Sequence, residues 1–374
     1  MLNLPQFRLG RLLGIPIEVN PTWLVVFALF AGLLSFNVFP AVFDWPVGVA
    51  LLNGVLTALL FFASILVHEM SHSLVARAGG IKISKITLFI FGGLAQMDEE
   101  PRSPGRELAM AVAGPGASLL LAALFFAVYA VLSFAGVSDR IWGPLEYLAL
   151  INLSVAVFNL LPGFPLDGGR VLRAILWAVS HDILKATLWA SRAGQVIGYL
   201  MISGAVVGVL SGMTQMIWTG LVGWFITVLA EASYRQQVVK SQLARVDVGS
   251  IMSPNPVVVS GDTTLDALVH ERFLGDRHSR YPVVEDGRVV GLVSLPQVKA
   301  VPQEDWHRMT AGHAADRDLT RLVVDDDTPV DDVLVRLGKD RPGALLVVRD
   351  GHVVGIVTRA DVVSALRDSS GGGA

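Results

Sequence analysis

The chain of 374 residues has no cysteine, and Asp, Glu, Lys and Arg together make up only 16% of it. The absence of cysteine excludes disulfide bonds, thiol nucleophiles and thiolate zinc ligands, so a metal would have to be bound by His and carboxylate side chains. The net charge of -3 provides no electrostatic footprint for nucleic acid. Binding to nucleic acid is therefore not expected.

Apolar residues make up more than half of the chain. The chain is 53% hydrophobic with a mean hydropathy of +0.58, and its apolar character is concentrated in the N-terminal part. No cleavable signal peptide is expected, because the first apolar run begins only after Pro21 and lacks a small-residue cleavage site. About six membrane-spanning helices are predicted in a bilayer, over Thr22–Val38, Pro46–Val67, Glu107–Ala135, Leu145–Leu161, Leu188–Leu210 and Met216–Leu229.

Lys and Arg residues orient these spans. They precede the first span and follow the second, fourth and sixth, whereas the opposite connections carry almost none, Arg140 being the exception. The positive-inside rule therefore predicts a multi-pass protein of the cell membrane with both termini in the cytoplasm. The cytoplasmic end of the second span then lies near His68 to His72.

The segment His68-Glu69-Met70-Ser71-His72 places three ionisable groups within an apolar run. Each such group at membrane depth costs a few kcal/mol. On a helix, H-E-x-x-H brings both imidazoles to one face, where they can ligate Zn²⁺ while the Glu acts on a water. A helix end with snorkelling polar groups is the structural alternative, and a buried zinc hydrolase site is the hypothesis.

A further metal ligand is needed, and two residues of the membrane part compete for this role. His181 lies in a polar loop between Ser180 and Asp182, which favours an exposed position. Asp167 lies at the inward end of the fourth span, in a segment whose Pro and Gly residues cannot maintain a helix. Irregular backbone at membrane depth is tolerated against protein or a wet cavity, so Asp167 is the predicted third ligand.

Together the two motifs resemble those of the site-2 proteases, zinc-dependent intramembrane peptidases with H-E-x-x-H on one helix and N-x-x-P-x-x-P-x-D-G on another. The resemblance implies one Zn²⁺ per chain, bound by His68, His72 and Asp167. It implies that Glu69 is the general base and then the acid. It also implies that Asn159 helps to orient the scissile carbonyl or its oxyanion.

Two more stretches fit this family. Ala113–Ser118 resembles an A-G-P-x-x-N element, but Ser118 stands where Asn is usual, so close helix packing is its expected role rather than catalysis. Ile81–Met97 reads as β-prone stretches around a Gly pair. The resemblance implies a hairpin near the active site whose edge holds the substrate as an added strand, and an ordinary interfacial hairpin is the alternative.

The C-terminal part contains an internal repeat: Tyr281–Ser294 is echoed by Leu345–Thr358 as a strand, an Asp-Gly turn and a strand. A helix-like segment precedes each copy, beginning with Thr264 and with Thr328, and Pro329 is predicted at a first helical position.

This part resembles a tandem pair of cystathionine-β-synthase (CBS) domains, α/β modules that pair across their sheets and often bind adenine nucleotides. By resemblance, Thr358 and Asp361 would contact the ribose of ATP, ADP or AMP, although a helix cap and a first-turn carboxylate explain both residues as well. In the first copy Gln297 replaces the Asp, so one nucleotide site is expected rather than two. A homodimer through these domains is a further expectation.

The expected architecture is therefore a polytopic α-helical membrane domain of about six spans with a small β-hairpin, followed by an α/β tandem CBS module. The expected limits are 1–240 for the protease domain, 248–305 for the first CBS domain and 311–368 for the second. The resemblance implies cleavage of membrane-anchored regulatory proteins, such as anti-sigma factors or membrane-tethered transcription-factor precursors. A CBS-gated transporter or channel and an inactive scaffold are the alternatives, and neither accounts for H-E-x-x-H with its Glu.

Overall fold

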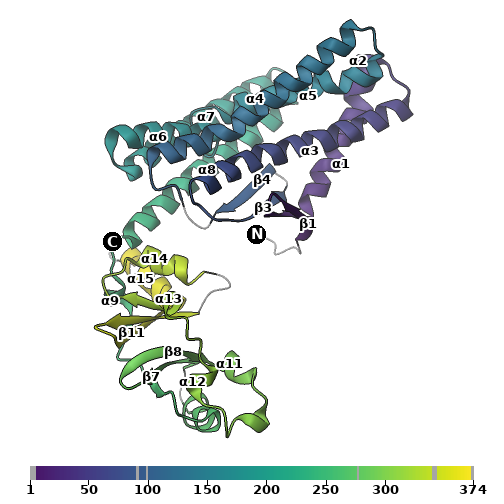
Figure 1. The fold of residues 1–374 in the computed structure, drawn as a ribbon. Coiled ribbons are helices and arrows are strands. Elements are labelled where there is room, and N and C mark those ends of the chain that lie inside the picture. The colour runs from purple at the N-terminus through teal and green to yellow at the C-terminus, as the bar shows by residue number, and fades with distance from the viewer. Residues whose placement is uncertain (1–5, 90–91, 98–99, 276–277, 339–342, 372–374) are drawn as a thin grey trace. The chain divides into compact units, whose positions relative to one another are not determined.

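The computed structural model describes residues 6–89, 92–97, 100–275, 278–338 and 343–371 (Figure 1). The chain divides into two compact units, Met1–Gln237 and Val238–Ala374. The division falls within the last long helix of the first unit, α8 (Met216–Leu243).

Long apolar helices build the first unit. Within the described residues, six helices are long and apolar enough to cross a membrane, which confirms the predicted number: Thr22–Phe43, Val47–Ala78, Pro104–Phe134, Asp139–Asn159, Ile183–Leu210 and Met216–Leu243. The first combines α1 (Thr22–Leu33), the π-helical η1 (Leu34–Val38) and α2 (Phe39–Phe43), and the others are α3, α4, α5, α7 and α8. Several helices extend beyond the predicted spans, because backbone hydrogen bonding continues past the apolar stretch.

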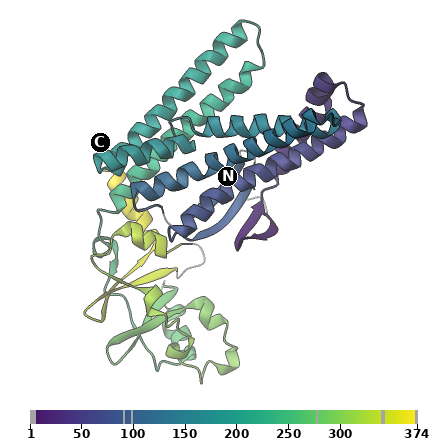
Figure 2. The ribbon, with the colours of Figure 1, turned by 45° about the horizontal axis from the view of Figure 1, so that its top comes forward.

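Helices α3 (Val47–Ala78) and α4 (Pro104–Phe134) run side by side, and α4 also packs against α5 (Asp139–Asn159) (Figure 1, Figure 2). A short amphipathic helix that the sequence did not predict, α6 (Asp167–Ser180), packs between α4 and α7 (Ile183–Leu210). It is too short to span a bilayer, and so the hydropathy pattern did not distinguish it from its surroundings.

The segment between α5 and α6 is irregular, as its Pro and Gly residues predicted. It packs tightly against α7: a Cβ atom on Gly163 would lie 2.5 Å from the Gly194 Cα atom. This close approach of two backbones is available only to glycine. The segment therefore delivers Asp167 at a fixed place, at the start of α6.

A four-stranded sheet accompanies the helices of the first unit, in the order β1 (Phe7–Leu12), β2 (Ile15–Val19), β3 (Ile83–Phe89) and β4 (Gly92–Met97). Strands β3 and β4 form the predicted hairpin. The β1–β2 hairpin was not predicted, because the Arg-containing β1 is exposed throughout and has no alternating pattern. Ile17 and Ile86 of the sheet pack with Met70 of α3 in one buried cluster, so the sheet is anchored beside H-E-x-x-H.

The second unit contains two sheets, in the orders β5-β11-β10-β9 and β6-β7-β8. Their strands are β5 (Ser253–Pro254), β6 (Val259–Ser260), β7 (Arg280–Glu285), β8 (Arg288–Ser294), β9 (Val323–Asp325), β10 (Ala344–Arg349) and β11 (His352–Thr358). The helices are α9 (Val248–Ile251), α10 (Leu265–Leu268), η2 (Val269–Phe273), α11 (Leu295–Lys299), η3 (Gln303–Asp305), α12 (Ala311–Ala314), α13 (Leu319–Leu322), α14 (Val330–Arg336) and α15 (Arg359–Gly371).

The internal repeat is visible in the hairpins β7–β8 and β10–β11. Both turn at an Asp-Gly pair with positive φ, at 49° and 77° for Asp286 and Gly287 and at 54° and 84° for Asp350 and Gly351. Both also carry a register shift at the same place in the repeat. The predicted Asp-Gly turns are confirmed, because this geometry requires residues that tolerate the left-handed region.

One helix start differs from its prediction. Helix α14 begins at Val330, and Pro329 is its N-cap with φ of -60° and ψ of 140°. Pro329 is therefore not the first helical residue: its carbonyl accepts the first backbone bonds of the helix, while its own backbone stays extended.

Residues that precede the first copy of the repeat contribute to the fold of the second copy. Strand β5 pairs with β11, and Val248 is buried in the same core as Val347.

Candidate metal centre and active site

His68 and His72 lie one turn apart on α3, and both are buried, with 4% and 7% of their surface exposed. The Nδ1 atom of His72 lies 2.7 Å from the Met110 carbonyl oxygen, and the Nδ1 atom of His68 lies 2.9 Å from the Ser118 hydroxyl. Because a carbonyl oxygen can only accept, His72 Nδ1 carries the proton, and the Nε2 atom of the neutral ring is left as a lone-pair donor to a metal.

Asp167 brings a carboxylate oxygen to the two imidazoles. Its Oδ2 atom lies 3.1 Å from His68 Nε2 and 3.2 Å from His72 Nε2, and the two Nε2 atoms are 3.3 Å apart. In tetrahedral zinc sites with bonds of roughly 2.0–2.1 Å, neighbouring ligand atoms are separated by about 3.3 Å. These three residues therefore fit one face of a tetrahedral zinc site. Among the residues that the structure describes, His68, His72 and Asp167 form a group whose ligand atoms are close enough together to hold one metal ion.

Two contacts that orient the imidazoles come from α4 and were not found from the sequence. Ser118, for which only helix packing was expected, contacts His68, and the Met110 carbonyl accepts from His72. Such partners of the second ring nitrogen fix the orientation of a metal-binding His. The hydroxyl at 118 was a signal that could have been read, whereas a backbone carbonyl has no sequence signature.

Gly114 of α4 forms the wall of the site. A Cβ atom at this position would lie 2.6 Å from His68 Nε2, far inside van der Waals contact. Helix α4 can therefore approach the donor atoms only because position 114 has no side chain. The small residues of Ala113–Ser118 do serve close packing, as expected from the sequence, and the site is what they pack against.

Glu69 is half-buried and faces the hairpin. A Cβ atom on Gly93 of β4 would lie 2.9 Å from Glu69 Cδ, so the backbone of β4 passes directly beside the carboxylate. Strand β4 is last in the order of its sheet. An open strand edge thus lies next to the carboxylate of H-E-x-x-H, within the described residues.

The other two predicted residues of the first unit, Asn159 and His181, lie at the C-terminal ends of α5 and α6. Asn159 is the last residue of α5, and its amide nitrogen donates to the Val155 carbonyl at 3.1 Å. His181 is exposed and caps the C-terminus of α6 in a left-handed conformation with φ of 55°. The exposed position expected for His181 agrees with this placement, and the described metal-binding group contains Asp167 instead.

Thr358 and Asp361 line a cavity of about 360 Å³ in the second unit. The Asp361 Oδ2 atom accepts hydrogen bonds from the Thr358 nitrogen and hydroxyl, each at 2.8 Å. This is the helix-cap arrangement that was the alternative to ligand binding, and it is present together with the cavity.

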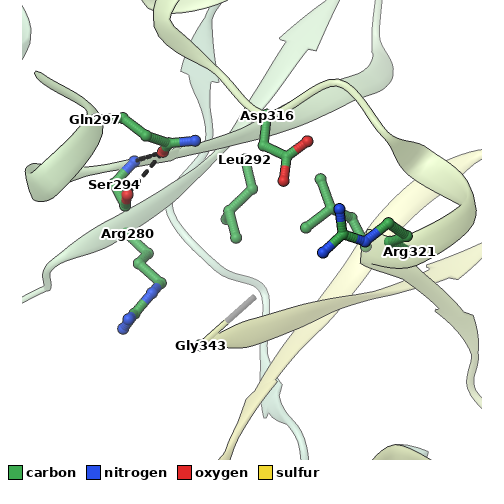
Figure 3. Close-up of a pocket in the computed structure, with 8 residues that line it drawn as sticks. Arg280, Leu292, Ser294, Gln297, Asp316, Arg321 and Gly343 are labelled. Atoms are coloured by element: carbon green, nitrogen blue, oxygen red, sulfur yellow. Dashed lines mark hydrogen bonds between the residues drawn. The ribbon is translucent and has the colours of Figure 1, made fainter. Parts of the chain in front are cut away.

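The first copy has a matching cap and a cavity of about 310 Å³, shown in Figure 3. Gln297 Oε1 accepts from the Ser294 nitrogen and hydroxyl, each at 2.7 Å. Arg280, Asp316 and Arg321 also line this cavity (Figure 3). The amide oxygen of Gln297 therefore forms the same cap that the carboxylate of Asp361 forms in the second copy. At this position the first cavity has an amide in place of a carboxylate.

Comparison with known proteins decides the family. The model of peptidase family M50 matches residues 56–143 and 136–204, and the CBS domain model matches residues 248–300 and 316–368. A Synechocystis sp. protein provisionally named a zinc metalloprotease is 34% identical, over 98% of this chain and 96% of the relative. A zinc metalloprotease of Methanocaldococcus jannaschii is 31% identical, over 96% of both chains.

The chain belongs to peptidase family M50. Among solved structures it is similar to the site-2 protease from Methanocaldococcus jannaschii, with 33% identity, 62% of this chain and 95% of that chain covered, and a TM-score of 0.45. The protein is thus a multi-pass zinc metalloprotease of the M50, or site-2 protease, family that carries two CBS domains. Family membership favours the protease interpretation over the transporter, the channel and the inactive scaffold.

Proposed function

We propose that this M50 protein hydrolyses a peptide bond within or beside the transmembrane segment of membrane-anchored proteins, with one zinc ion held by His68, His72 and Asp167. The observation that carries the proposal is the convergence of three metal-binding atoms, 3.1–3.3 Å apart, in a buried place. Zinc bound there would supply Lewis acidity for the scissile carbonyl and for the attacking water.

The protein's own residues would then move the proton. Glu69 takes it from the attacking water as general base and returns it to the leaving amine nitrogen as general acid. Asn159 lies at the end of α5, at the entrance to the segment that carries Asp167. Its role is to turn its amide from the Val155 carbonyl to the scissile carbonyl or its oxyanion, which lowers the energy of the charged species.

The substrate must present an extended chain, because a carbonyl locked in a helix is already hydrogen-bonded and shielded. Strand β4 provides a place for it, since a peptide can add to an open sheet edge through main-chain hydrogen bonds. The nearness of Gly93 to Glu69 supports this placement. A transmembrane helix would unwind locally and pair with β4 so that one of its carbonyls faces the metal.

The distribution of Lys and Arg supports cytoplasmic termini and a site that opens toward the cytoplasm. Suitable substrates are membrane-anchored regulators whose cleavage releases a soluble factor on that side, such as anti-sigma factors or membrane-tethered transcription-factor precursors. Membership of the family supports this substrate class, and the distribution of Lys and Arg supports the cytoplasmic side.

The decisive experiment compares the purified wild-type protein with Glu69→Gln in liposomes that contain a single-span regulator of the same host. The variant should retain zinc, measured by atomic absorption, and lose cleavage, since it keeps all three ligands and loses the base. His72→Ala should lose both. If wild-type protein carries no zinc and His72→Ala changes neither metal content nor cleavage, the proposal is wrong.

For the second unit, we propose that the cavity beside Thr358 and Asp361 binds an adenine nucleotide that adjusts protease activity, and that the CBS domains form a homodimer. Calorimetric titration of the full chain with ATP, ADP and AMP tests the nucleotide. Asp361→Gln introduces the residue that forms the same cap in the first copy of the repeat, where Gln297 uses its amide oxygen. The variant should therefore keep the fold and bind the nucleotide more weakly. Absence of heat with all three nucleotides contradicts binding, and sedimentation of the full chain tests the dimer.

A further inference from the structure

Glu107 of α4 and Arg173 of α6 form a buried ion pair inside the helical unit. Glu107 is fully buried and Arg173 is 8% exposed. The Arg173 Nε atom donates to Glu107 Oε1 at 2.6 Å, and a terminal guanidinium nitrogen contacts the same oxygen. Such a pair is weak evidence for stability, because removing two charges from water offsets much of their attraction. Its position in the fold indicates a different role.

The pair lies between two parts of the metal site. Glu107 is one helical turn before Met110, whose carbonyl orients His72. The Arg173 guanidinium stacks over the ring of Phe164, 5.1 Å from its centroid, and Phe164 is buried shortly before Asp167 in the irregular segment. One guanidinium therefore joins the helix that orients one ligand to the segment that delivers another.

The position of Asp167 depends on contacts from other elements, because the start of α6 has no side-chain cap that would fix it. Leu166 is the N-cap of this helix and makes no side-chain capping bond. The carboxylate thus depends on how α6 and the segment before it are held against α4. An Arg can hold both at once, since its planar group forms directed hydrogen bonds to a carboxylate while its face stacks on an aromatic ring.

We propose that Arg173 and Glu107 are positioning residues that hold Asp167 against His68 and His72, so that the three donor atoms form the zinc site. This inference rests on the ligands of the proposed function. Both residues act through others and touch neither the metal nor the substrate.

The test measures metal affinity of the full chain in detergent by competition with a chelator. The double variant Glu107→Leu/Arg173→Met removes both charges at similar volume, and such replacements of buried pairs usually preserve the fold. Its zinc affinity should fall by roughly tenfold or more, as for other supports of metal ligands. The absorption bands of bound Co²⁺ should change, while the melting temperature of the metal-free protein stays near that of the wild type.

Arg173→Lys retains the charge but loses the planar stack on Phe164, so its affinity should fall by less than that of the double variant. This variant decides the outcome where the double variant does not fold. Asp139→Asn is the matched control: Asp139, at the start of α5, accepts a part-buried hydrogen bond at 3.1 Å from Nε1 of Trp45, which lies between α2 and α3. Its affinity should equal that of the wild type.

Unchanged zinc affinity and Co²⁺ bands in the double variant, or in Arg173→Lys where it is the deciding protein, would overturn the positioning role. The proposed function fails separately, when wild-type protein binds no metal or His72→Ala binds it as tightly. A fall in affinity that Asp139→Asn reproduces would also overturn the inference, because it would trace the effect to general stability.

Discussion

Gly114 of α4 lies so close to His68 of α3 that a single added methyl group would stand 2.6 Å from the imidazole Nε2 atom. Gly114→Ala should therefore push α4 away or turn the imidazole. Overpacking of this kind costs typically about 1–3 kcal/mol, which corresponds to roughly tenfold weaker zinc binding or more. Gly116→Ala on the same helix is the control, because its Cβ would meet nothing within 4 Å. Equal zinc affinity of the two variants would contradict the prediction.

Ser118 should matter through its hydroxyl. Ser118→Ala removes the group 2.9 Å from His68 Nδ1 and frees the ring to rotate, so zinc affinity should fall by roughly 10- to 100-fold. Ser118→Asn, which introduces the Asn of the A-G-P-x-x-N element that Ala113–Ser118 resembles, should keep most of the affinity. Ser154→Ala removes an exposed hydroxyl bonded to its own helix and should change nothing. Chelator competition measures all three, and a loss in Ser154→Ala equal to that in Ser118→Ala would count against a specific role.

Gly93 should control the base rather than the metal. A side chain at this position overlaps Glu69, so Gly93→Val should displace the carboxylate and reduce cleavage on the order of 100-fold, with zinc content unchanged. Gln96→Ala, on the same strand at an exposed position, is the control. A single-turnover cleavage assay with metal analysis separates the two effects. Loss of zinc in Gly93→Val would show that β4 supports the ligands instead.

Glu18 should make the sheet of the first unit sensitive to acid. The hydrogen bond from Lys85 lowers the pKa of the Glu18 carboxyl below its ordinary value, outweighing burial. A group whose pKa is lower in the folded state stabilises the fold above its ordinary pKa, and this contribution is lost as the pH falls through the lowered pKa. Hydrogen exchange of peptides covering β2 and β3 should therefore accelerate relative to Glu18→Gln as the pH falls from about 5 to 3. Parallel rates in the two proteins would contradict this.

The three metal-binding residues could be predicted because each is a polar residue in a sequence context that gives it no structural role. His68 and His72 were ionisable groups at helical spacing in an apolar run. Asp167 followed a segment whose Pro and Gly residues cannot maintain a regular helix. Their proximity followed from counting spans and placing both motifs at one membrane level. Distances of 3.1–3.3 Å between the donor atoms agree with that reasoning.

The surroundings of the site could not be predicted in the same way. Arg173 reads as one more charge after the fourth span, and its burial against Glu107 arises from how α6 packs on α4. The Met110 carbonyl has no side-chain signature at all. Helix α6 itself is shorter than a membrane span, and β1 has no alternation of exposed and buried residues, so neither gave a pattern to read.

Strand β2 pairs in parallel with β3, although α1, α2 and α3 separate them in the chain. During synthesis the β1–β2 hairpin emerges first, and it must wait with an open β2 edge until β3 arrives on the same side of the bilayer. That requires two complete crossings between Val19 and Ile83, so insertion of the first two spans as a pair becomes a precondition for closing the sheet. A nascent chain arrested before Ile83 should accordingly expose this edge to chaperones or to other strands.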